Sequence, residues 1–96
     1  MSDLPHPPEC AERQVTFTTF VLSLSTAALE QLGYGPEEAA QKPAVNLCLA
    51  RQTIDLLEML ESKTKGNLSE DEGRLLTSIL YDLRIRFVQT SKGECR

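Results

Sequence analysis

Residues 47–88 decide the fold, and they read LCLARQTIDLLEMLESKTKGNLSEDEGRLLTSILYDLRIRFV. Apolar residues recur in this stretch every three or four positions, a spacing typical of two amphipathic helices. Between the two helices, Gly66 suits the left-handed position that follows a helix end. Ser69 and Glu72 then form a capping box, in which each side chain accepts a hydrogen bond from a free backbone amide. The short link predicts two antiparallel helices packed as neighbours.

Helical wheels give the expected bounds and apolar faces of this hairpin. The first helix is expected over Leu47–Thr64, with Asn46 as its N-cap. Its apolar arc contains Leu49, Ala50, Thr53, Ile54, Leu56, Leu57 and Leu60. The second helix is expected over Glu70–Val88, where two favourable ion pairs join residues four apart. These pairs are Glu70–Arg74 and Asp82–Arg86. The main apolar stripe of the second helix contains Leu76, Ile79, Leu80, Leu83 and Phe87.

A further apolar segment lies upstream and predicts a helix over Thr16–Leu32, with Gly33 as a left-handed stop. Its apolar face contains Phe17, Phe20, Val21, Leu24, Ala27, Ala28 and Leu32, and Leu22 and Leu29 extend it. Its polar side contains only Thr19, Ser23, Thr26 and Glu30. A helix with so much apolar circumference is expected to be buried on most sides.

The remaining segments set the domain organisation. Residues 1–14 contain Pro5, Pro7 and Pro8, which predicts a flexible arm because proline lacks the amide proton that a helix needs. A single helical domain is expected over residues 15–90, with one short helical turn after Pro36, and a frayed tail over 91–96. Strand-like alternation is absent from the sequence. The predicted fold class is therefore all-α: a three-helix unit with an antiparallel hairpin, completed by dimerisation.

Composition excludes several classes of function. The chain has 96 residues with a net charge of −4, which is poorly suited to neutralising nucleic-acid phosphates. A membrane-spanning helix needs an apolar run of about 18 residues, and the sequence contains none. The N-terminus lacks the basic start and apolar core of a signal peptide. We therefore expect a cytoplasmic protein whose cysteines, Cys10, Cys48 and Cys95, are reduced.

The apolar surface predicted for the helices exceeds what three short helices can bury among themselves. A second apolar cluster lies opposite the main stripe of the last helix, and the first helix carries an extended face. The candidate interface consists of Leu22, Leu29, Tyr81, Ile85 and Val88. We expect these side chains to mediate homodimerisation, with the first helix at the centre. Two alternatives remain, namely a different protein as partner and a monomer with ordinary scattered exposed apolar residues.

No constellation of titratable groups predicts a catalytic residue, a cofactor site or a metal site. The single histidine, His6, lies in the arm beside Cys10, and these two ligands make no closed metal site. Cys48 lies in the first turn of its helix near Arg51, which leaves open a small-molecule or metal-dependent enzyme. Such an enzyme would use Cys48 with the acids of the same helix, Asp55, Glu58 and Glu61. A non-enzymatic interaction module is favoured because no partner base for the thiol is visible.

Attachment of the first helix to a membrane surface is a third hypothesis. Interfacial helices usually carry Lys or Arg along the polar face, whereas residues 16–32 carry hydroxyl groups and Glu30. Burial in protein is therefore the preferred interpretation.

Five stretches of the chain resemble a family of short bacterial proteins known as a domain of unknown function, number eighteen forty-four. The matching stretches are FTTFVLSL at 17–24, NL at 46–47, QTIDLLEML at 52–60, KTKGNL at 63–68 and LYDLR at 80–84. The resemblance covers about residues 15–88, and residues 52–68 are its specific part. It implies a bacterial origin and a compact helical domain, and it transfers no functional site.

Overall fold

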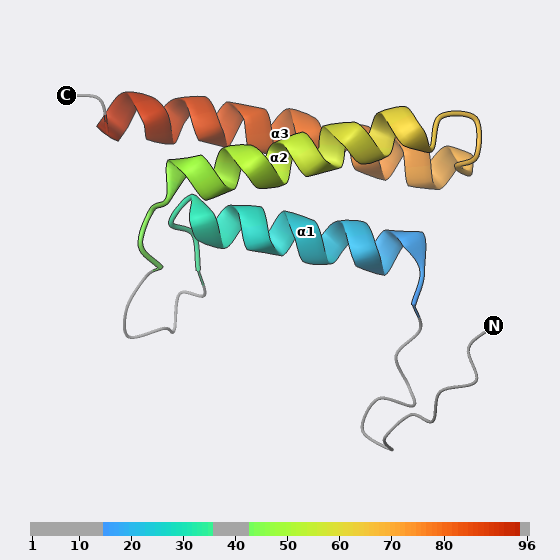
Figure 1. The fold of residues 1–96 in the computed structure, drawn as a ribbon, viewed down its shortest axis with the longest axis horizontal. Coiled ribbons are helices and arrows are strands. Elements are labelled where there is room, and N and C mark those ends of the chain that lie inside the picture. The colour runs from blue at the N-terminus through green and yellow to red at the C-terminus, as the bar shows by residue number, and fades with distance from the viewer. Residues whose placement is uncertain (1–14, 36–42, 95–96) are drawn as a thin grey trace, which may run out of the picture.

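The part of the chain that the structure describes forms three helices packed side by side (Figure 1). The computed structural model describes residues 15–35 and 43–94, and it contains no strand within those ranges. Helix α1 spans Phe17–Gln31, α2 spans Leu47–Lys63 and α3 spans Glu70–Glu94. The chain reverses direction after each helix, so α2 runs antiparallel to both α1 and α3 (Figure 1). The all-α prediction is confirmed, while the predicted arm and the predicted turn after Pro36 lie outside the described residues.

The ends of α1 are fixed by local hydrogen bonds. The Thr16 hydroxyl accepts from the Thr19 amide at 3.1 Å, and the Thr19 hydroxyl accepts from the Thr16 amide at 3.0 Å. At the other end Gly33 has a φ of +96°, and a Cβ atom there would lie 2.9 Å from Val45 Cγ2. The predicted left-handed stop is confirmed, since only glycine combines that φ with so little space.

The predicted hairpin of α2 and α3 is also confirmed at each cap. The Asn46 side-chain oxygen accepts from the Leu49 amide at 3.0 Å, and Gly66 adopts a φ of +88°. The Ser69 hydroxyl accepts from the Glu72 amide at 3.2 Å. The Glu72 carboxylate in turn accepts from the Ser69 amide at 2.9 Å. These bonds satisfy backbone groups that a helix end would otherwise leave unpaired.

Helix α3 extends beyond its expected end at Val88 and continues to Glu94. Residues 91–94, expected in the frayed tail, therefore belong to the helix. Phe87 packs against the core just before this extension, and Thr90 and Ser91 within it are half-buried. Lys92 lies in the last turn, where a cation favours the helix dipole.

The core forms where the three predicted apolar faces meet. Its buried apolar members are Val21, Ala28, Leu32, Ala50, Ile54, Leu57, Leu76, Leu80 and Leu83. The buried Thr53 hydroxyl lies 2.7 Å from Gln31 Oε1 and 3.1 Å from the Leu49 carbonyl oxygen, so α1 and α2 share a satisfied polar contact. All ten residues belong to the predicted faces.

Three large apolar residues predicted for those faces are exposed. Phe20 is 48% exposed, Leu49 is 45% exposed and Leu56 is 47% exposed. Each lies at the margin of its apolar arc, and α3 is the only other described helix available to cover the α1–α2 pair. Within a single chain, α1 is consequently buried on one side only, so the expected burial on most sides stays a prediction that depends on a partner.

Candidate functional site

Four of the five candidate interface residues are exposed on the surface of the chain. Tyr81 is 68% exposed, Val88 is 50%, Leu22 is 45% and Ile85 is 40%. Leu29 instead is half-buried and packs against the core. Tyr81, Ile85 and Val88 follow one another at spacings of four and three residues, so they share one face of α3. We call these three residues the α3 face.

The structure separates Leu22 from the α3 face. Thr77 and Arg84 of α3 bind Glu61 and Glu58 of α2, and each lies one turn before a member of the α3 face. The α3 face therefore borders α2. The side of α3 nearest α1 is marked by Arg86, which lies over the ring of Tyr34 after the end of α1. The sequence-based interface thus divides into two surfaces, one on α3 and one on α1.

Two ion pairs and one cation–π contact lie beside the α3 face. The Arg84 guanidinium donates to Glu58 Oε2 at 2.7 and 3.1 Å, and both side chains are roughly half exposed. Arg86 donates to Asp82 Oδ2 at 2.7 Å, and its guanidinium carbon lies 4.7 Å from the centre of the Tyr34 ring. Hydrogen bonds with Asp82 and then Tyr34 raise the pKa of Arg86. The Arg84–Glu58 pair joins α3 to α2, whereas the Asp82–Arg86 pair lies within α3.

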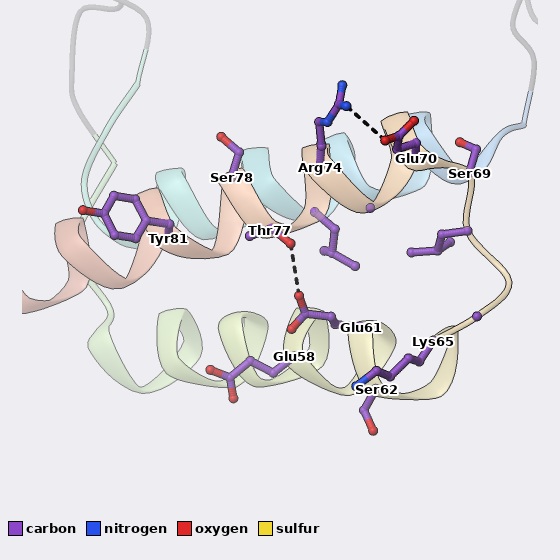
Figure 2. A pocket seen from close by; sticks show the side chains of 14 residues that line it. Glu58, Glu61, Ser62, Lys65, Ser69, Glu70, Arg74, Thr77, Ser78 and Tyr81 are labelled. Atoms are coloured by element: carbon purple, nitrogen blue, oxygen red, sulfur yellow. Dashed lines mark hydrogen bonds and ion pairs between the residues drawn. The ribbon is translucent and has the colours of Figure 1, made fainter.

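An open groove between α2 and α3 runs from the hairpin turn to the α3 face (Figure 2). It has a volume of about 1200 Å³. Leu68 and Leu76 contribute apolar lining, and Tyr81 lies at the end away from the turn (Figure 2). A Cβ atom at Gly73, which also lines the groove, would meet nothing within 4 Å. This groove was not predicted from the sequence, where Gly73, a residue without a side chain inside a predicted helix, could have indicated it.

The outer side of α1 forms a second surface with little charge. Among residues 17–31 only Glu30 is charged. Hydroxyl groups on this side donate to the helix's own carbonyl oxygens, with Ser23 bonded to Phe20 at 2.8 Å and Thr26 bonded to Leu22 at 3.0 Å. Phe20, which sequence reasoning assigned to the core, is exposed here. These hydroxyl groups donate within the helix, and the exposed apolar side chains of Phe20 and Leu22 lie beside them.

The residues of the enzymatic hypothesis do not converge. Cys48 is exposed in the first turn of α2, as its position predicts. Arg51, three residues on, binds Asp55 at 3.4 Å. Glu58 binds Arg84, and Glu61 accepts from the Thr77 hydroxyl at 3.4 Å. Within residues 15–35 and 43–94, no three His, Cys, Asp or Glu side chains are grouped so that they could hold a metal ion.

Comparison with known proteins gives one match. The model of a family described as "Domain of unknown function (DUF1844)" matches residues 14–89. No curated protein and no solved structure matches the chain. In the part of the chain that the structure describes, none of the helices has the length and apolar character needed to cross a membrane.

Proposed function

This chain belongs to the DUF1844 family, whose function is unknown, and we propose that it is a non-enzymatic helical interaction module that forms a homodimer. The observation that carries the proposal is the α3 face, where three large side chains are 40–68% exposed on one helix. Their exposure is the property that an interface residue needs. The cytoplasmic location and the bacterial origin are sequence-based parts of the same proposal.

The energetic argument rests on the size of the domain. A chain of this length buries only about 60% of its unfolded surface when it folds alone. Burying apolar surface contributes about 25 cal/mol per Å². A second subunit that covers the exposed side chains therefore adds apolar burial that the isolated chain lacks.

Sedimentation equilibrium of the purified full chain tests the proposal. We expect the average mass to rise from that of one chain to that of two as the concentration increases through the micromolar range. A mass that stays at 10.7 kDa throughout this range would contradict self-association. The measurement is made under reducing conditions, because three cysteines are present and a disulfide-linked dimer would imitate the expected result.

A further inference from the structure

The α3 face belongs to a longer repeat along the exposed side of α3. Starting at Asp71, positions recur at alternating spacings of three and four residues. The positions are Asp71, Arg74, Ser78, Tyr81, Ile85, Val88 and Lys92. All seven are exposed. This spacing is that of the contact seam between two helices in a coiled coil, with its apolar members at the centre and C-terminal part.

The charges along α3 favour one type of partner. The first turn contains Glu70, Asp71 and Glu72, and the last turn contains Lys92. Arg84 and Arg86 lie near the middle of the helix and are already paired with Glu58 and Asp82. A second copy of α3 in antiparallel orientation would place Asp71 of each copy beside Lys92 of the other. A parallel copy would place like charges together, which costs free energy. Asp71 and Lys92, at the two ends of the repeat, are therefore complementary under a two-fold rotation.

The sizes of the side chains agree with the same orientation. A two-fold axis near Tyr81 and Asp82 places Ser78 of one copy beside Ile85 of the other. A large apolar side chain then packs against a small one on both sides of the axis, as helix packing requires. The same axis brings Lys92 of one copy within a turn of Asp71 of the other, whose side chain is 96% exposed.

We infer that the α3 face binds the α3 face of a second copy, antiparallel and across a two-fold axis near Tyr81. This inference rests on the proposed self-association and adds its surface and its orientation. A contact made by one helix from each copy is at the low end of specific interfaces, which begin at about 1,200 Å². We therefore expect a dimer that exchanges with monomer, and sedimentation over the micromolar range measures its dissociation constant.

Charged substitutions test which surface makes the contact. We expect Tyr81→Asp with Ile85→Asp to raise the dissociation constant roughly tenfold or more, because both side chains become charged inside the contact. The matched control is Ser23→Asp with Thr26→Asp, which adds the same charge to exposed positions on the outer side of α1. The control is expected to change the constant by less than about threefold. Sedimentation equilibrium gives both constants, and circular dichroism checks that each variant is folded.

Cross-linking tests the orientation without removing any apolar side chain. In a chain with Cys10, Cys48 and Cys95 replaced by serine, one variant carries Ser78→Cys and a second carries Thr26→Cys. A short bis-maleimide should link two copies of the first variant, because position 78 lies within one heptad of the proposed axis. It should leave the second variant unlinked, because position 26 lies on α1.

The outcomes separate this inference from the proposed function. Dimerisation of the unmodified chain with cross-linking at position 26 instead of 78 would overturn the α3 contact and leave self-association intact. Dimerisation that survives Tyr81→Asp with Ile85→Asp would do the same. A chain that is monomeric at every concentration would overturn both. Loss of the dimer in the α3 variant, with cross-linking at position 78, supports the inference.

Discussion

At the scale of single residues, Gly73 and Gly33 are expected to respond in opposite ways to substitution by alanine. Gly73 lies inside α3 with an ordinary φ, and a Cβ atom there would meet nothing within 4 Å. We expect Gly73→Ala to raise the free energy of unfolding by about 0.5–1 kcal/mol, because alanine loses less conformational freedom in a helix. Urea denaturation at a concentration where the protein is monomeric measures this change.

Gly33→Ala is the natural control for that substitution. Its φ of +96° and the 2.9 Å approach to Val45 Cγ2 make alanine strained at this position. It should therefore lower the free energy of unfolding by about 1 kcal/mol or more. If Gly73→Ala were destabilising, the space beside Gly73 in the groove would have to be occupied in solution, whereas it is open in the structure of the single chain.

At the scale of the helices, the capping box before α3 sets where the helix begins. We expect Ser69→Ala to destabilise the protein by about 1 kcal/mol, since the Glu72 amide would lose its acceptor. Ser62→Ala, on the exposed side of α2, should stay within about 0.5 kcal/mol of the unmodified protein. Equal effects of the two substitutions in thermal or urea denaturation would argue against the box as the determinant of the α3 start.

Features of the helices that depend on neighbouring residues in the sequence could be predicted, and features that depend on packing between helices could not. Helix starts at Asn46 and Ser69 were predictable because each cap is made within three residues of the chain. The end of α3 was not, because residues 89–92 contain neither a glycine nor a proline that would mark where the helix stops. The exposure of Phe20 and Leu56 depends on which margin of each helix α3 covers, and a helical wheel contains no information about that.

For the candidate site, sequence reasoning placed three large apolar residues on one side of the last helix, and the structure shows that they are exposed there. Tyr81, Ile85 and Val88 were predictable as one cluster because residues on a helix share a face through local geometry. Their separation from Leu22 was not predictable, since it depends on the rotation of α1 and α3 about their own axes. That rotation is seen only in the structure, where Arg84 contacts Glu58 of α2 and Arg86 lies over the ring of Tyr34.

At the scale of the whole molecule, self-association predicts that thermal stability depends on protein concentration. Mass action favours the associated state by about 1.4 kcal/mol per dimer for each tenfold increase in concentration. Half of this change belongs to each chain, which corresponds to a rise in Tm of about 3–5 °C for a domain of this size. Differential scanning calorimetry at two concentrations across the dissociation constant measures the shift.

The variant Tyr81→Asp with Ile85→Asp provides the control for this shift. Its exposed substitutions leave the core unchanged, so its Tm should equal that of the unmodified chain at low concentration and should not rise with concentration. A constant Tm for both proteins would mean that dimerisation contributes nothing to folding. In that case the buried apolar core of the single chain and the caps of its helices would be sufficient for its stability, without a second copy.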